Sequence, residues 1–95
     1  MADWKTRAHL EDHYELHRRE LRVRSVEEHD ASAQETVSLG VRFTYRDRRT
    51  NESRVGYFDR ESSRFVATDL DGLIVTHYQT DEAHVAGLPR STYRD

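Results

Sequence analysis

Three histidines stand four residues apart near the start of the chain, in the stretch HLEDHYELH that contains His9, His13 and His17. A spacing of four places side chains on one face of an α-helix. Two histidines so placed can chelate a divalent metal. They can also serve as acid and base, because imidazole exchanges protons near neutral pH. Solvated or structural histidine is the third interpretation, and the spacing leaves all three open.

The surroundings of these histidines favour a pair rather than a triad. Tyr14, not the glutamate of an HExxH zinc motif, follows His13, and the chain has no cysteine, so we expect neither a metal nor another cofactor. His13 and His17 form the candidate pair, and His9 is expected to be solvated because it lies a turn earlier. His29 and His84 lack a neighbouring motif and are not included in the candidate site.

Composition limits what the domain can be. Its 95 residues are enough for a single small domain, and charged residues make up 35% of them. The net charge of -3 comes from 15 basic and 18 acidic residues, so a nucleic-acid site would need local clustering of cations. All basic residues except Lys5 are arginine, which binds phosphate bidentately.

The sequence contains no apolar export segment at its start and no apolar run of membrane-spanning length. We therefore expect a cytoplasmic protein with no membrane partner.

Two helices are predicted before residue 40. Residues 3–22 contain no glycine or proline and have the composition of a helix. One face of this helix combines four residues at helical spacing: Leu10, Tyr14, His17 and Leu21. Ser25 and Glu28 form a capping box that predicts a second helix from Val26 to about Thr36. One side of this helix is expected to carry Val26, Asp30, Ala33 and Val37.

After Gly40 the hydrophobic period changes to two, which is typical of strands. Four strands are predicted, at Val41–Arg46, Arg54–Asp59, Arg64–Thr68 and Leu73–Gln79, with Asp71-Gly72 as a hairpin turn. A helical turn is expected at Glu82–Ala86. The predicted fold is α+β: two N-terminal helices (about 3–37) packed on one face of a four-stranded antiparallel meander (about 41–79), followed by a tail (80–95) with a short helical turn.

Strand alternation divides the predicted sheet into two faces. The face expected to lie under the helices carries Val41, Phe43, Tyr45, Val55, Tyr57, Phe65, Ala67, Leu73, Val75 and His77. The other carries Arg42, Thr44, Arg46, Arg54, Phe58, Arg64, Thr68, Ile74, Thr76 and Tyr78. Arginines and hydroxyls on an open face bind phosphate and sugar oxygens, so we expect Arg42, Arg46, Arg54 and Thr68 to bind RNA. The outer face of a one-sided sheet is also commonly just solvated.

These patterns together resemble the superfamily of small nucleases that includes barnase, EndoU-like nucleases, colicin-type tRNases and RelE-like toxins, and above all its phage and polymorphic-toxin domains. The resemblance rests on the helical pair His13 and His17 and on two strand motifs. These are Ser62-Ser63-Arg64-Phe65, similar to T-x-R-F, and Asp71-Gly72-Leu73-Ile74-Val75-Thr76-His77-Tyr78, similar to D-G-x-I-x-T-x-F. It spans roughly residues 10–80.

The resemblance implies metal-independent cleavage of RNA or tRNA by attack of the ribose 2′-OH on phosphorus, as in a bacterial toxin effector. His13 and His17 would then act as base and acid, in an order that the motif leaves open. Arg64 would bind phosphate, Thr76 would contact the scissile phosphate, and Tyr78 would stack a base or assist proton transfer. His77 is expected to point away from Thr76, toward the helices.

A non-catalytic α+β module that binds a protein or dimerises through a sheet edge is the rival hypothesis. The partners compatible with the sequence are RNA or tRNA, a cognate inhibitor protein, and a second copy in a homodimer.

Overall fold

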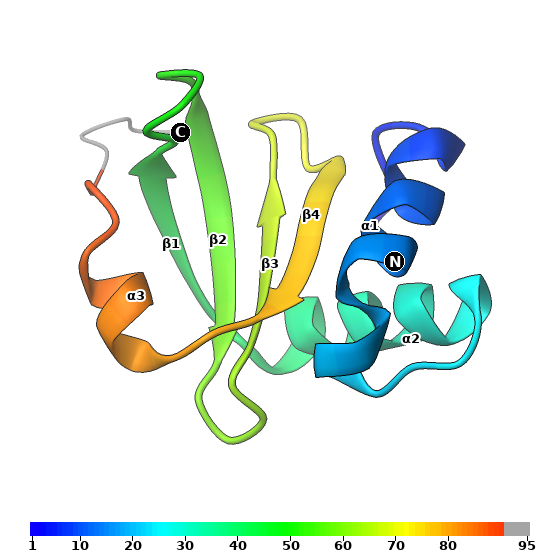
Figure 1. Ribbon diagram of the computed structural model, residues 1–95. Coiled ribbons are helices and arrows are strands. Elements are labelled where there is room, and N and C mark those ends of the chain that lie inside the picture. Colours follow the sequence, from blue (N-terminus) through cyan, green and yellow to red (C-terminus); the bar gives the residue numbers. More distant parts are fainter. Residues whose placement is uncertain (91–95) are drawn as a thin grey trace.

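The computed structural model describes residues 1–90, so the end of the predicted tail, residues 91–95, lies outside it. Two helices, four strands and a third short helix follow one another along the chain (Figure 1). Their bounds are α1 Arg7–Leu21, α2 Val26–Leu39, β1 Val41–Arg46, β2 Ser53–Asp59, β3 Arg64–Thr68, β4 Ile74–Gln79 and α3 Glu82–Ala86. The predicted α+β class and element order are confirmed.

The first helix begins later than predicted because the residues before it pair with the sheet. Lys5 N donates to Ile74 O (2.8 Å) and Ile74 N donates to Asp3 O (2.7 Å), so Trp4 forms a parallel bridge beside β4. Thr6 then caps α1 by accepting a hydrogen bond from His9 N at 3.0 Å. Backbone groups that would otherwise be unpaired are thus satisfied by β4 rather than by another helical turn.

The second helix begins where the capping box predicts. Ser25 Oγ accepts from Glu28 N at 3.1 Å, and α2 continues to Leu39, past the predicted end. Of the side predicted from the sequence, Ala33 is buried and Val37 packs against its cluster. The buried residues of the helix are His29, Ser32, Ala33 and Thr36. Three of these four are polar, so the apolar periodicity of the sequence does not reveal them.

The sheet is an antiparallel meander in the order β1-β2-β3-β4. Gly72, with φ +88°, supplies the left-handed residue of the β3–β4 turn. The register shifts beside Ala67 and Thr68, where β4 carries an extra residue between Ile74 and Thr76. As a result Val75 and Thr76 lie on the same side of the sheet, since Val75 packs with the cluster around Phe65 and Thr76 is opposite Ala67.

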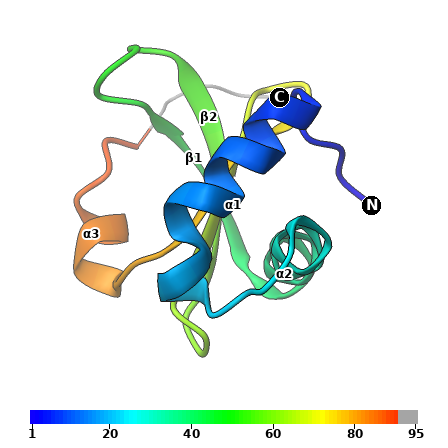
Figure 2. The same ribbon diagram turned by 45° about the vertical axis from the view of Figure 1, so that its right-hand side comes forward.

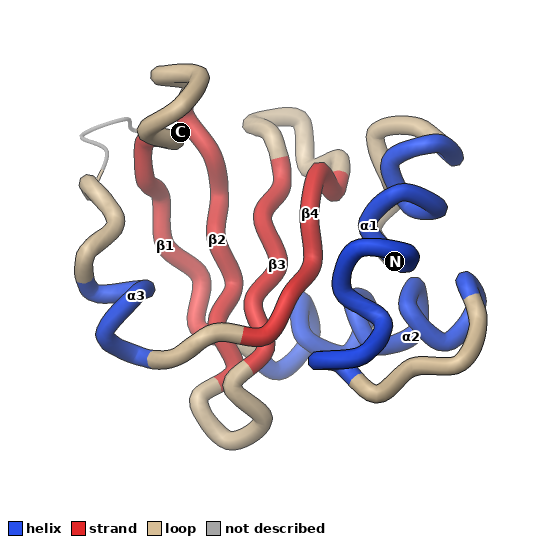
Figure 3. The backbone as a smooth tube through the Cα atoms, viewed as in Figure 1, coloured by secondary structure: helices blue, strands red, loops and turns tan. Residues whose placement is uncertain are grey.

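The helices occupy three different places around the sheet. Helix α2 packs on β2 and β3, and α1 packs along β4 at the sheet edge. Helix α3 lies over the opposite face, near β1, as Figures 1 and 2 show together. The tube in Figure 3 makes the resulting arrangement plain: the open face of the sheet is flanked by α1 on one side and α3 on the other.

Both faces of the central strands are therefore buried. A cluster of Ala33, Val66 and Ile74 lies under α2. On the opposite face, Val85 of α3 packs with Tyr45, Phe58, Phe65 and Ala67.

The predicted division of side chains between the two faces is wrong in part. Tyr57 and His77 pair with Val66 and lie on the α2 face, whereas Phe58 and Tyr78 pair with Phe65 on the other. When a strand is apolar on both sides, its sequence does not show which alternate residues face the helix and which face the opposite side. His77 does point toward a helix as expected, since it bonds Ser32 of α2.

Among the described residues, no helix is long and apolar enough to cross a membrane.

Candidate functional site

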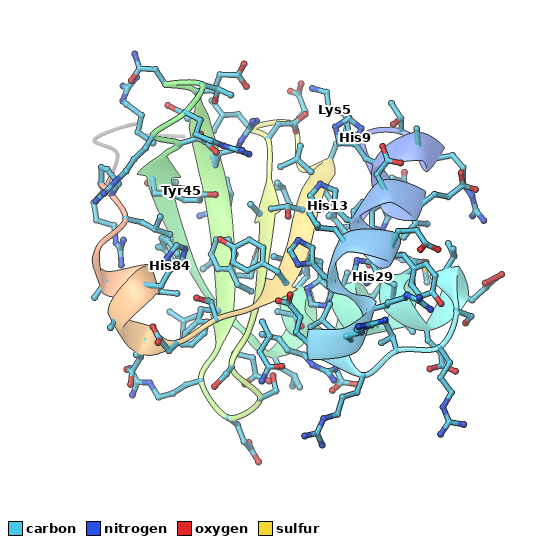
Figure 4. All side chains as sticks on the ribbon, in the orientation of Figure 1. Lys5, His9, His13, His29, Tyr45 and His84 are labelled. Atoms are coloured by element: carbon cyan, nitrogen blue, oxygen red, sulfur yellow. The ribbon has the colours of Figure 1, made fainter. Side chains whose placement is uncertain are left out.

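A cleft of about 760 Å³ opens on the face of the sheet opposite α2. We call it the histidine cleft. Its floor is formed by strand residues Tyr45, Arg54, Ala67, Val75, Thr76 and Tyr78. One wall is α1 and the Lys5 beside it; the other is the β1–β2 loop with His84 and Leu88. Figure 4 shows His9 and His13 on the α1 side and His84 across from them, on α3.

The three helical histidines form a ladder along the α1 wall. The ring centroids of His9 and His13 are 6.5 Å apart and those of His13 and His17 are 5.6 Å apart, with interplanar angles of 9° and 18°. The stripe of three histidines thus points into the cleft. Of the face predicted from Leu10, Tyr14, His17 and Leu21, only His17 lines the cleft, while Leu10 and Leu21 are buried. His9, which we expected to be solvated outside the site, lines the cleft with the other two.

Each ring of the ladder is held through its Nδ1 atom. Nδ1 of His9 lies 2.7 Å from Thr6 Oγ1, that of His13 lies 3.0 Å from Thr76 Oγ1, and that of His17 lies 3.0 Å from Glu20 Oε1. Within residues 1–90 no hydrogen bond to the Nε2 atoms of these rings is formed. All three Nε2 atoms are therefore free to meet a ligand.

The contact with Glu20 decides which nitrogen of His17 is basic. A carboxylate only accepts, so His17 donates from Nδ1 and its neutral ring keeps the lone pair on Nε2. The other carboxylate oxygen of Glu20 accepts from Gln79 N at 3.0 Å, which ties α1 to the end of β4. Glu20 thus fixes both the position and the tautomer of His17.

His13 is the middle histidine of the ladder and is partly buried. Burial lowers its pKa, and the neighbouring His17 and His9 lower it further because like charges repel. The imidazole of His13 is consequently neutral near pH 7. With Nδ1 beside Thr76, it is suited to bind an oxygen of a ligand rather than to carry a permanent charge.

Tyr78 extends from the floor between the two walls. Its ring centroid lies 5.5 Å from that of His17, and its hydroxyl oxygen lies 3.2 Å from His84 Nε2. Burial, and next the nearby Asp47, raise the pKa of Tyr78 to about 12. The phenol is therefore protonated at neutral pH.

Four permanent cations line the cleft, against two acids, Asp47 and Glu52. Lys5 pairs with Asp69 (2.9 Å), Arg54 pairs with Glu52 (3.1 Å), and Arg48 donates to the carbonyl oxygen of Gly87.

Arg49 differs from the other three cations, because its guanidinium has no hydrogen bond or ion pair within the described residues. It is close enough to His13 to lower the pKa of that ring. Arg49 is the cation most available to an anionic ligand.

Among the predicted site residues, the cleft brings together His13, His17, Thr76, Tyr78 and Arg54. Arg64 does not join them. Its guanidinium lies on the α2 face, where it donates to Ser32 Oγ (2.9 Å) and Leu21 O (3.1 Å). The expectation that Arg64 meets the histidines is wrong, because residues 64 and 65 of β3 point to opposite faces and Phe65 takes the cleft side.

The other predicted RNA-binding residues also lie outside the cleft. Thr68 is buried and donates to Asp69 O at 2.8 Å. Arg46 donates to Asn51 O within the β1–β2 loop, and Arg42 pairs with Tyr57 on the α2 side of the sheet.

Sequence reasoning missed Lys5, Arg48, Arg49 and His84. The adjacent arginines of the β1–β2 loop were a visible signal, whereas His84 had none, because only the chain path after β4 brings it back over the sheet.

Two further histidines are buried on the α2 face. His77 Nδ1 donates to Phe65 O (2.9 Å), and its Nε2 accepts from the Ser32 hydroxyl (2.8 Å). Both ring nitrogens of His29 lack a hydrogen-bond partner within the described residues. Burial lowers the pKa of His77 to about 3 and that of His29 to about 4, so both are neutral structural residues.

Within residues 1–90, no three His, Asp or Glu side chains are grouped as ligands for one metal ion. Comparison of the chain with protein-family models, curated proteins and solved structures found no match. Function is therefore inferred from the histidine cleft itself.

Proposed function

We propose that this protein is a metal-independent ribonuclease that cleaves RNA at the histidine cleft by attack of a ribose 2′-OH on the adjacent phosphorus. The observation that carries the proposal is the His17–Glu20 pair. A carboxylate bonded to Nδ1 leaves Nε2 as a positioned base on the wall of a cationic cleft.

His17 is assigned as the general base. Its Nε2 removes the proton from the 2′-OH, and Glu20 stabilises the imidazolium that forms, since the Nδ1–H···carboxylate bond strengthens when the ring is charged. The helical position of His17 and the second bond of Glu20 to Gln79 N hold this base in place.

Arg49 is assigned to the charge that develops on the phosphorane. Its guanidinium lacks an ion-pair partner among the described residues and is close to His13. The resemblance implied a phosphate-binding role for Arg64, and we assign this role instead to Arg49 of the β1–β2 loop. His13 and Thr76, joined at 3.0 Å, are placed to bind a phosphate oxygen or the ribose.

The size and charge of the cleft suit a nucleotide. Its volume of about 760 Å³ lies within the usual range of ligand pockets. The chain as a whole is acidic, with a net charge of -3. The cleft concentrates four cations against two acids, which is the local clustering that RNA binding requires.

The test is incubation of the purified protein with total RNA in EDTA, followed by analysis of the ends. We expect 2′,3′-cyclic phosphate and 5′-hydroxyl ends. His17→Ala should reduce the rate by about 10²–10⁴-fold, and Arg49→Ala by about 10-fold or more. Arg18→Ala, on the exposed side of the same helix, is the matched control and should retain full activity. A folded wild-type protein that cleaves no RNA at any concentration would refute the proposal and favour a non-catalytic binding module.

A further inference from the structure

Cleavage by 2′-OH attack needs a proton donor as well as a base. The attacking and departing oxygens stand on opposite sides of phosphorus, so the donor must approach from the side opposite the base. The histidines of the ladder all belong to α1 and line the same wall of the cleft. The α1 wall therefore supplies a base, but it does not supply a proton donor for the departing oxygen.

His13 is the nearest alternative donor, and its surroundings argue against that role. It stands beside His17 on the same helix face, so it would approach phosphorus from the side of the base. Burial and the neighbouring histidines lower its pKa, so it is neutral at the pH where a donor must be protonated. His13 is better suited to contact an oxygen than to protonate one.

The floor offers Tyr78 and the opposite wall offers His84. The Tyr78 hydroxyl oxygen lies 3.2 Å from His84 Nε2, and the two rings are nearly perpendicular at 72°. The Tyr78 ring also lies 5.5 Å from His17. The pair thus faces the base across the floor of the cleft.

Helix α3 holds His84 in place by three independent contacts. Asp81 Oδ1 accepts from His84 N at 2.8 Å, and Glu82 pairs with Arg60 at 2.8 Å. Val85 is 7% exposed and packs into the cluster around Phe65. The His84 side chain is itself exposed to solvent.

Building on the proposed ribonuclease function, we propose that Tyr78 is the proton donor to the leaving oxygen and that His84 is the positioning residue that recharges it. His17 Nε2 takes the 2′-OH proton, the O2′–P bond forms and the P–O5′ bond breaks. The Tyr78 hydroxyl gives its proton to O5′, and the His84 imidazolium gives its Nε2 proton to the phenolate. The products are a 2′,3′-cyclic phosphate and a 5′-hydroxyl, with His17 protonated and His84 neutral; solvent restores both.

The environment of Tyr78 explains why a partner is needed. Burial and Asp47 raise its pKa to about 12, so an isolated phenolate would be costly in the cleft. An imidazolium in hydrogen-bond contact removes that cost by transferring its own proton as the phenol loses one.

The experiment compares two substrates that differ only in their need for a donor. One is a uridine dinucleotide, whose 5′-oxygen must be protonated as it leaves. The other is uridine 3′-(p-nitrophenyl phosphate), whose leaving group departs as a stable anion. Tyr78→Phe and His84→Ala should each slow the dinucleotide by about 100-fold and the nitrophenyl ester less than 5-fold. The double variant should be no slower than either single one, because the two residues act as one unit.

The pH dependence gives a second readout that a purely structural role of His84 would not change. In the wild type the dinucleotide rate should fall at high pH, because the donor must be protonated to act, and both variants should lose this fall. Ala83→Gln, on the exposed side of α3, is the matched control and should behave as wild type.

The outcomes separate the two proposals. Equal losses on both substrates would mean that Tyr78 and His84 only shape the cleft, and unchanged dinucleotide cleavage would mean that they take no part; either result overturns the donor assignment alone. Wild-type protein that cleaves neither substrate overturns the ribonuclease proposal and the donor with it.

Discussion

The two faces of the sheet both hold histidines, yet they use them in opposite ways. On the α2 face, His29 and His77 are fully buried and surrounded by helix and strand. On the cleft face, His13, His17 and His84 line an open hollow. The residue type is the same on both faces, so the difference comes from the elements that pack over each face of the sheet.

The degree of burial determines whether these rings can carry a charge. Under α2, loss of water disfavours the charged imidazole and lowers the pKa of His77 to about 3. In the cleft, His17 keeps a carboxylate on Nδ1 and a free Nε2. One environment makes a neutral packing residue, and the other leaves a ring nitrogen open to the cleft.

Arg64 and Arg49 show the same contrast between the α2 face and the cleft face. Arg64 is anchored on the α2 face by Ser32 Oγ and Leu21 O, whereas Arg49 in the cleft has no such anchor among residues 1–90. A cation that is already bonded within the fold supports the fold, and an unbonded one is available to a ligand.

The largest expected effect is a difference in folding stability between substitution of a buried histidine and substitution of a cleft histidine. His77→Ala should lower the free energy of unfolding by about 3–5 kcal/mol, since it leaves a cavity and removes the partners of Ser32 and Phe65 O. His17→Ala should change it by less than about 1 kcal/mol. Urea denaturation followed by circular dichroism measures both. Equal losses would show that the cleft histidines are also structural.

The two arginines give the next largest difference. Arg64→Ala should destabilise the fold by about 2–3 kcal/mol, because Ser32 and the C-terminal end of α1 lose a charged donor. Arg49→Ala should leave stability within about 0.5 kcal/mol and weaken RNA binding about 10-fold with a smaller salt dependence. Denaturation and fluorescence anisotropy in a salt series test the pair. A stable Arg64→Ala variant with weakened RNA binding would contradict the assignment.

Acid should unfold the protein through the α2 face. The pKa values of His29 and His77, about 4 and about 3, lie below the ordinary value of 6.5, so the unfolded chain binds more protons. Stability is therefore full above pH 6.5 and is lost as the pH falls toward and through the folded values. We expect a loss of about 4 kcal/mol by pH 5, roughly 2 kcal/mol from each histidine, measured by urea denaturation at a series of pH values. A stability that does not change between pH 7 and pH 5 would contradict this prediction.

The smallest expected effect isolates His29. Both of its ring nitrogens are buried without a hydrogen-bond partner in the described part of the chain. His29→Leu removes these unpaired polar atoms and should raise stability by up to about 1 kcal/mol. It should also reduce the acid sensitivity, while RNA cleavage stays unchanged. Retained acid sensitivity would assign that effect to His77 alone.

The sequence by itself determined the local structure. The Ser25 capping box begins α2, the change to period two after Gly40 places β1, and Gly72 marks the last hairpin. The i, i+4 spacing likewise put His13 and His17 on one helical face. These features depend on residues a few positions apart, whose geometry is set by backbone dihedrals and helical period.

Only the tertiary structure decided which side chains meet. Arg64 was expected beside Thr76, yet β3 turns Arg64 under α2, and the bulge in β4 sets Thr76 toward His13. His84 enters the cleft because the chain after β4 returns across the open face. When central strands are apolar on both sides, their sequence does not show which side chains point to which face of the sheet. Contacts between distant segments depend on strand register and on which elements pack over each face, and the alternation of apolar residues alone specifies neither.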